Sequence, residues 1–119
     1  LVGALTNLRA TIDYCQRSDR DVVVLAAGWK GQASMEDILY AGAFTVEAGA
    51  IAGDDATRMV RDLWKDHAAT LDARTEYIKS SDHYVRLEQA GFADCATYCM
   101  SLSLFNLVLR LEDGWLRTL

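Results

Sequence analysis

The chain has 119 residues, 51% of them hydrophobic and 24% charged, which is typical of one globular domain with a buried core. Twelve lysines and arginines against seventeen acidic residues give a net charge of −5, which argues against non-specific binding to nucleic acid or to an anionic membrane. No apolar run approaches the roughly 20 residues that a transmembrane helix needs.

The beginning of the chain predicts a strand, a helix and a second strand. Leu1 to Leu5 is short and apolar, and the helix after it carries apolar residues on one face from Leu8 to Cys15. Val22 to Ala27 is an unbroken apolar run with β-branched residues at its start, as in a strand buried on both faces. A strand–helix–strand unit of this length favours two parallel strands with a right-handed connection.

A glycine loop and a helix start follow the second predicted strand directly. Gly28 and Gly31 interrupt the chain on either side of Lys30, and Ser34 with Asp37 has the spacing of a capping box. This junction places backbone amides, a lysine and carboxylates beyond the carboxyl end of a strand, where ligands bind in open α/β sheets. We expect any functional site of this chain to centre on it.

Helical periodicity dominates the next part of the sequence. It continues from Ala56 to Lys79, either as one long helix or as two helices with a kink near Thr70. A further helix is expected over Asp82 to Ala90, ended by Gly91.

The end of the chain predicts strands. Residues 94–100 alternate like a half-buried strand, and Asp113-Gly114 predicts the turn of a hairpin between residues 106–111 and 115–119. The expected fold is therefore a single α/β domain over residues 1–119, with a layered, mixed but mostly parallel sheet flanked by helices and a C-terminal β-hairpin.

The junction sequence A-A-G-W-K-G-Q-A-S-M-E-D-I-L-Y-A-G-A, residues 26–43, resembles the signature of the 2-phosphosulfolactate phosphatase family. V-G-A-L-T-N at residues 2–7 and L-E-Q-A-G-F-A-D at residues 87–94 agree with the same family. The resemblance covers nearly the whole chain and corresponds to the carboxyl-terminal half of the family fold. The sequence departs from the family at Ala26, where many members have cysteine, and after Cys99, where an acidic residue and a Val-Pro step are expected.

The resemblance implies a magnesium-dependent phosphatase that hydrolyses 2-phosphosulfolactate to sulfolactate and phosphate, a step of coenzyme M biosynthesis. It implies that Glu36 and Asp37 are catalytic carboxylates and ligands of Mg²⁺. One or two carboxylates together with substrate phosphate suffice to hold this ion. Acidic residues in a first helical turn also complement the helix dipole, so a purely structural role for the pair is the alternative.

The expected substrate is a small anion that carries phosphate and sulfonate groups. Gly28, Lys30 and Gly31 are its candidate contacts, because glycine lets backbone amides approach an anion closely. The alternative is an ordinary strand-to-helix turn with a solvated lysine. The resemblance adds Asn7 and Asp94, for which the alternatives are a helix cap and a water-facing residue.

The sequence gives weaker indications of a catalytic or metal-binding role for the histidines and cysteines. His83 lies near a helix start and is a candidate general acid or phosphate contact, whereas His67 is expected to be half-buried on an apolar helix face. Cys15, Cys95 and Cys99 lack zinc-site spacing and are expected to be reduced, buried thiols in a cytoplasmic protein.

Two alternative functions remain open at this point: a non-catalytic binding or assembly domain of the same fold, and a phosphatase for another small phosphorylated acid. The expected partners are the small anionic substrate and either a second copy of the chain or the family's amino-terminal half. We expect the 119 residues to be an incomplete enzyme with an unpaired sheet edge, exposed apolar helix faces and an open groove at Glu36 and Asp37.

Overall fold

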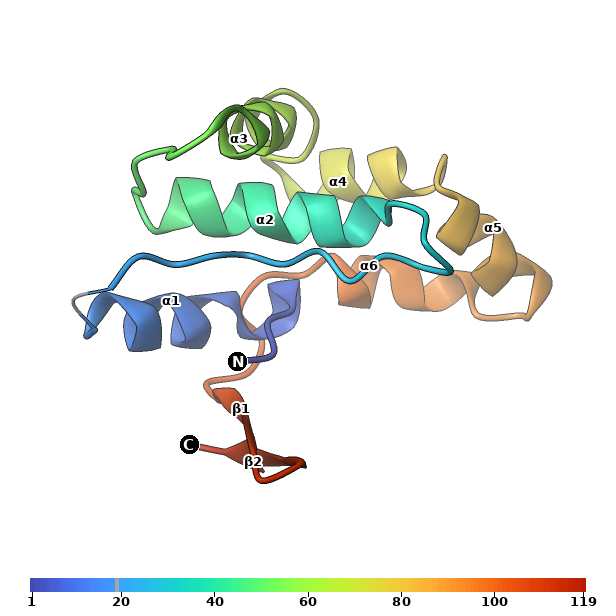
Figure 1. Ribbon diagram of the computed structural model, residues 1–119. Helices are drawn as coiled ribbons and strands as arrows, with labels where there is room; N and C mark the ends of the chain where they lie inside the picture. The colour runs from blue at the N-terminus through green and yellow to red at the C-terminus, as the bar shows by residue number, and fades with distance from the viewer. Residues whose placement is uncertain (19) are drawn as a thin grey trace.

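A helix of 13 residues, α2 (Met35–Glu47), occupies the centre of the molecule. The computed structural model describes residues 1–18 and 20–119. In it, α3 (Asp55–His67) packs on one side of α2, while α1 (Leu8–Gln16) and α6 (Ala96–Cys99) lie on the other (Figure 1). Residues 41–45 are all buried, and five consecutive residues cover more than one helical turn. Because a helix that is apolar on all sides must be covered on all sides, α2 takes the central position.

The first helix packs its apolar face against α2. A short 3₁₀ turn, η1 (Leu5–Asn7), leads into α1 (Leu8–Gln16), which confirms the predicted helix. The strand predicted over Leu1 to Leu5 is wrong, since only Val2 makes a bridge there. Leu8 and Ile12 lie four residues apart on one face and are almost completely buried. With Leu39 of α2 they form the centre of the hydrophobic core.

The long periodic segment forms two helices, which confirms the second of the two expected arrangements. They are α3 (Asp55–His67) and α4 (Leu71–Ile78). Asp54 caps α3 by accepting a hydrogen bond from the Thr57 amide at 2.7 Å, and the Thr70 hydroxyl accepts from the Ala73 amide at 3.2 Å. A new N-cap at Thr70 is the local reason for the break.

The predicted helix over residues 82–90 is confirmed as α5 (Asp82–Gln89), with the Ser81 hydroxyl accepting from the Tyr84 amide. The predicted strand over residues 94–100 is wrong. These residues form a 3₁₀ turn, η2 (Ala93–Cys95), and a short helix, α6 (Ala96–Cys99). Ala96 and Met100 are the buried residues of this stretch, and a separation of four positions repeats equally in a strand and in a helix.

The C-terminal hairpin is confirmed. Strands β1 (Leu109–Glu112) and β2 (Trp115–Thr118) pair in antiparallel register around the Asp113-Gly114 turn. Both turn residues have positive φ, +50° and +79°, as a type I′ turn requires.

The expected parallel sheet does not form among the described residues, where the hairpin is the sheet present. Val2 makes a single antiparallel bridge to Leu109, and residues 22–27 run extended across α1 and α2 without pairing to a strand (Figure 1). A strand needs neighbours to bond its N–H and C=O groups, and the described parts of this chain place none beside residues 22–27. Over residues 1–18 and 20–119, the fold is therefore a mixture of six α-helices, two 3₁₀ turns and one antiparallel hairpin.

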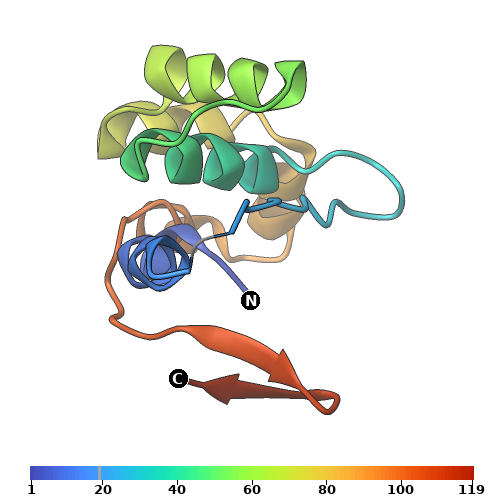
Figure 2. The ribbon, with the colours of Figure 1, turned by 60° about the vertical axis from the view of Figure 1, so that its left-hand side comes forward.

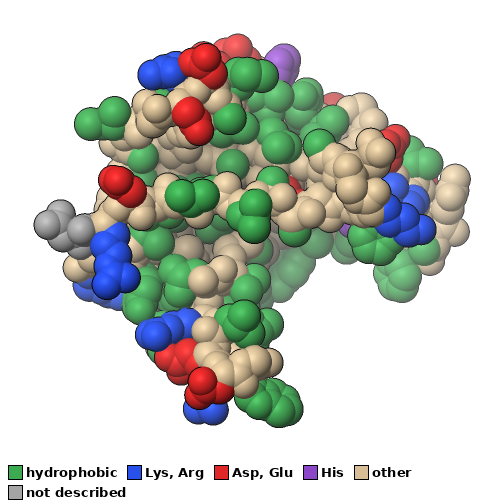
Figure 3. Space-filling view, viewed as in Figure 1, with side chains coloured by type: hydrophobic (Ala, Val, Ile, Leu, Met, Phe, Trp, Pro, Cys, Tyr) green, Lys and Arg blue, Asp and Glu red, His purple; other side chains and the backbone are tan. Residues whose placement is uncertain are grey.

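The extended segment exposes the apolar side chains that the sequence predicts to be buried. Val23 is 89% exposed and Leu25 is 88% exposed. Hydrophobic side chains follow the segment along the surface (Figure 3). The expectation that residues 22–27 are buried on both faces is therefore wrong. No helix in residues 1–18 and 20–119 is long and apolar enough to cross a membrane.

Candidate functional site

The loop that enters α2 contains a type I′ turn. Trp29 and Gln32 exchange both backbone hydrogen bonds, each with an N···O distance of 2.9 Å, and Lys30 and Gly31 between them have φ of +49° and +77°. Holding a lysine in the left-handed region costs roughly 1 kcal/mol, which glycine at the same position would avoid. The turn carries Lys30 at its tip, in a loop that projects from the helices (Figure 2).

Gly28 and Asp37 fasten this loop to α2. The Gly28 amide donates to Asp37 Oδ2 at 2.7 Å. Gly28 has a φ of +69°, and a side chain there would collide with the Gln32 carbonyl oxygen, so only glycine fits. The predicted capping box of Ser34 with Asp37 is wrong, because Asp37 bonds to Gly28 and the Ser34 hydroxyl donates to Glu36 Oε2 at 3.0 Å.

A line of polar side chains joins the first turn of α2 to the first turn of α5. Glu36 Oε1 lies 3.5 Å from His83 Nε2, and Arg86 Nη2 lies 3.4 Å from His83 Nδ1. The arginine can only donate, so the neutral form of His83 that suits both contacts accepts at Nδ1 and donates from Nε2 to Glu36. This arrangement presents a proton on His83 beside a carboxylate.

These side chains surround an open cavity of about 480 Å³, a volume within the range of small-molecule sites. Residues 34–36 and 80–83 both line it, so α2 and α5 begin at the same cavity. The amino end of a helix carries a partial positive charge, and two such ends favour a bound anion. The cavity is lined by Trp29, Lys30, Gln32, Ala33, Ser34, Met35, Glu36, Ser80, Ser81, Asp82, His83 and Arg86.

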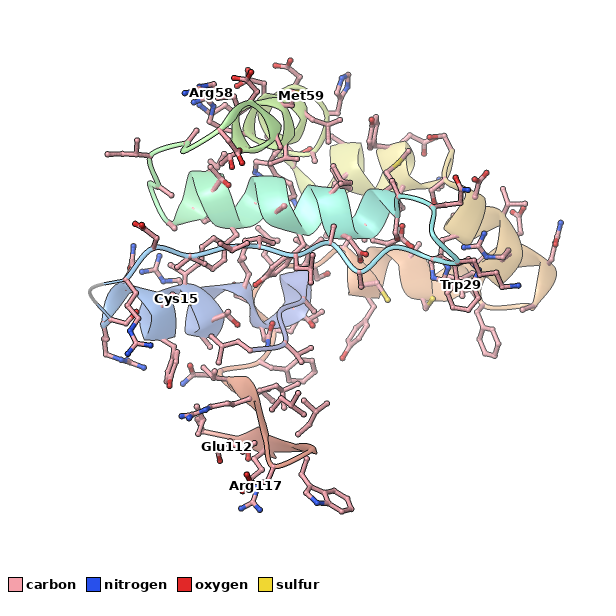
Figure 4. The ribbon with its side chains drawn as sticks, in the orientation of Figure 1. Cys15, Trp29, Arg58, Met59, Glu112 and Arg117 are labelled. Carbon is pink, nitrogen blue, oxygen red and sulfur yellow. The ribbon has the colours of Figure 1, made fainter. Side chains whose placement is uncertain are left out.

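Trp29 brings two cations together at one side of this cavity. Lys30 Nζ lies 5.8 Å and Arg86 Cζ lies 5.6 Å from the centre of its ring, within the range of cation–π contacts. The indole is 53% exposed and stands beside α5 (Figure 4). Sequence reasoning missed Arg86 and Trp29 as site residues, because their contact depends on the meeting of α2 and α5.

A second cavity, of about 240 Å³, lies next to the first. Glu36 and His83 line both cavities, and Asp37 and Tyr40 line the second one. Burial raises the pKa of Tyr40 to about 12, so its hydroxyl stays protonated at neutral pH. Glu36 and Asp37 thus reach one shared cavity that is open to solvent, as expected.

Asn7 and Asp94 lie elsewhere in the described part of the chain. Asn7 is buried; its Oδ1 accepts from the Ala4 amide at 2.8 Å, and its Nδ2 donates to the Val2 carbonyl at 3.3 Å. Asp94 is exposed in η2. Neither residue is among those lining the two cavities. A substrate contact for either remains a prediction.

The carboxylates fit a metal ion that is held mostly by water and substrate. Within residues 1–18 and 20–119, no group of three or more His, Cys, Asp or Glu side chains gathers as a protein cage would. Asp37 uses one oxygen for the Gly28 amide and has a second carboxylate oxygen, and Glu36 lies next to it in the same helical turn. Mg²⁺ keeps several waters and needs few protein carboxylates. The pair suits Mg²⁺ better than an ion that demands four protein ligands.

The remaining candidates are His67 and the three cysteines. Of these, Cys95 and Cys99 line the second cavity, and His67 and Cys15 line neither cavity. His67 is exposed and stacks on Tyr77 at a ring distance of 5.0 Å, so the expectation that it is half-buried is wrong. All three cysteines are free thiols, as expected. Cys15 and Cys95 are only partly buried and Cys99 is exposed, so the expectation that all three are buried is wrong.

Comparison with known proteins gives a consistent result. Residues 1–114 match the family described as 2-phosphosulpholactate phosphatase. A protein of Caldanaerobacter subterraneus named "probable 2-phosphosulfolactate phosphatase" is 30% identical over 99% of this chain and 49% of its own length. Proteins of the same name from Pseudothermotoga lettingae and Thermotoga petrophila are also 30% identical, over 93% and 96% of this chain and 48% of their own lengths.

The chain therefore spans about half the length of the curated relatives it matches. The match includes all the residues that line the first cavity, from Trp29 to Glu36 and from Ser80 to Arg86, since they lie within residues 1–114. On this evidence the chain belongs to the 2-phosphosulfolactate phosphatase family.

Proposed function

We propose that the chain supplies the catalytic carboxylates and much of the anion-binding surface of a phosphatase that hydrolyses 2-phosphosulfolactate. The observation that carries this proposal is the cavity where α2 and α5 begin. It combines two helix amino ends, two cations, His83 and Glu36, and Asp37 lines the adjoining cavity. Family membership supports the same class of reaction.

The side chains divide into three roles in the proposed site. The starts of α2 and α5 would face the phosphate. Glu36 and Asp37 would hold Mg²⁺, which offsets the phosphate charge and orients water when bound. Asp37 also keeps the loop in place through the Gly28 amide.

His83 is the best-placed residue to supply a proton to the leaving oxygen. Hydrolysis adds water across the ester P–O bond, so one proton must end on the alcohol of the product and the other on phosphate or solvent. His83 Nε2 lies 3.5 Å from Glu36 Oε1, and in the tautomer that lets Nδ1 accept from Arg86 this Nε2 carries the proton. Because His83 also lines both cavities, it can reach a substrate bound at the carboxylate pair.

Phosphate release tests the proposed function. With Mg²⁺ present, 2-phosphosulfolactate should be hydrolysed faster than 2-phospholactate, which lacks the sulfonate, and a chelator should stop both reactions. The assay is run on the 119-residue chain alone and together with the part of the Caldanaerobacter relative that lies outside the alignment. Binding of 2-phosphosulfolactate without phosphate release from either sample would contradict catalysis and favour the non-catalytic binding domain.

We also propose that residues 22–27 become a sheet strand by pairing with a strand from the rest of a family-length protein. The segment is already extended, its side chains are apolar, and Val23 and Leu25 are almost fully exposed. Pairing would bond its backbone groups and bury these side chains, giving the layered, mostly parallel sheet expected from the sequence. The family relatives are long enough to supply such strands.

Charged residues on this segment should prevent the pairing. Val23→Lys with Leu25→Lys should weaken binding of the complementary part of the relative by about tenfold or more, since two buried apolar side chains contribute more than 1.4 kcal/mol. Ile51→Lys, at a site that is 97% exposed, is the matched control and should bind normally. Hydrogen exchange should slow at residues 22–27 in the complex. Unchanged exchange there, or self-association of the chain in place of binding, would contradict this pairing.

A further inference from the structure

We propose that Arg86, Lys30 and the Trp29 indole form a separate subsite that binds the sulfonate group of the substrate. This inference rests on the proposed function and adds the residues that distinguish a sulfonated acid from other phosphorylated acids. The three side chains come from the loop and from α5, and all of them line the larger cavity.

The arrangement of charge is the first reason. Lys30 Nζ lies 5.8 Å and Arg86 Cζ lies 5.6 Å from the centre of the same ring, so two positive charges adjoin one indole. Among the ion pairs of the described residues, neither cation has a carboxylate partner. The cavity's two carboxylates are Glu36, bonded to Ser34 and facing His83, and Asp82, exposed at the start of α5. An anion bound at this side of the cavity would offset the charge of these cations.

The backbone is the second reason. Lys30 occupies the first left-handed position of the type I′ turn, where glycine or asparagine is more favourable. A lysine at this position therefore does not stabilise the turn. Its side chain lies beside Trp29 at the cavity. We infer that the lysine is present because it binds a ligand.

The chemistry of the two anionic groups is the third reason. A phosphate dianion has high charge density and suits Mg²⁺ and the carboxylate pair that would hold it. A sulfonate is a weakly basic monoanion with three acceptor oxygens. A guanidinium, which is weakly hydrated, an ammonium and an indole N–H are donors suited to such a group. Glu36 and His83 adjoin this subsite, so a substrate that spans a few bonds can reach both.

Binding of sulfolactate in the absence of Mg²⁺ tests this subsite without turnover. Calorimetry should show that sulfolactate binds and that lactate, which lacks the sulfonate, does not. The indole N–H resonance of Trp29, assigned with Trp29→Phe, should shift during the titration. Arg86→Gln and Lys30→Gly should each weaken sulfolactate binding about tenfold, as expected for one charge-assisted contact.

Two controls separate binding from folding. Lys30→Gly should keep or raise the unfolding temperature, because glycine removes the left-handed strain while the anion contact is lost. Arg117→Gln changes an exposed arginine of the hairpin, far from the cavity in sequence, and should leave binding unchanged (Figure 4). Affinity for inorganic phosphate should change less than twofold in Arg86→Gln.

Two results would overturn the subsite. One is sulfolactate binding that survives both Arg86→Gln and Lys30→Gly, and the other is an equal loss of phosphate binding in Arg86→Gln. Sulfolactate binding is measured without turnover, so a negative phosphatase assay would contradict the proposed function without contradicting the subsite.

Discussion

A chain that carries Glu36→Gln and Asp37→Asn together should lose magnesium-dependent phosphate release by roughly a hundredfold or more. Both changes remove a negative charge and keep the shape of the side chain. The asparagine carbonyl can still accept from the Gly28 amide, and the glutamine carbonyl can still accept from Ser34, so the loop and the start of α2 should persist. The unfolding temperature is therefore expected to change by only a few degrees.

The measurement is steady-state phosphate release over a magnesium titration, with thermal unfolding recorded on the same samples. Asp72→Asn is the matched control, because Asp72 is likewise an acid in a first helical turn, that of α4, and lies outside both cavities. Asp37→Ala separates the two roles of Asp37, since alanine removes the loop anchor as well as the charge. Retained activity in the double variant, or collapse of its fold, would show that the pair serves only as structure.

Replacing Gly42 by alanine should lower the free energy of unfolding by roughly 3 kcal/mol. Gly42 lies in α2 at the contact with α3. A methyl group there would collide with the Val60 carbonyl oxygen and lie 2.8 Å from Trp64 Cβ. Both obstacles belong to a packed helix rather than to the end of a flexible side chain, so relief requires the two helices to move apart.

Urea or guanidinium unfolding of the variant checks this value. Gly53→Ala is the control, because a Cβ at Gly53 meets nothing within 4 Å, and it should be neutral or slightly stabilising. Helix propensity alone predicts that Gly42→Ala gains about 1 kcal/mol. A gain of that kind would mean that α2 and α3 do not approach as closely as described.

Much of the local structure could be predicted because its causes are local. The hairpin follows from Asp113-Gly114, whose two positive φ values suit a type I′ turn. The break before α4 follows from Thr70, and the glycine loop follows from Gly28 and Gly31. The sequence also indicated that a site would centre on Glu36 and Asp37, since the family motif and the start of a helix coincide there. The predicted capping box does not form, because Asp37 accepts its hydrogen bond from the Gly28 amide, which lies outside the helix.

By itself, the sequence determined the helices from α1 to α5, the hairpin turn at Asp113-Gly114 and the membership of a family, since each depends on residues close together in the chain or on their order. The tertiary structure alone decided which apolar residues are buried. Residues 22–27 have the composition of a buried strand and remain exposed, because a strand is stabilised only by neighbours. It also decided the composition of the site. Arg86 and Trp29 meet because α2 and α5 begin at one cavity, a contact that no local pattern encodes.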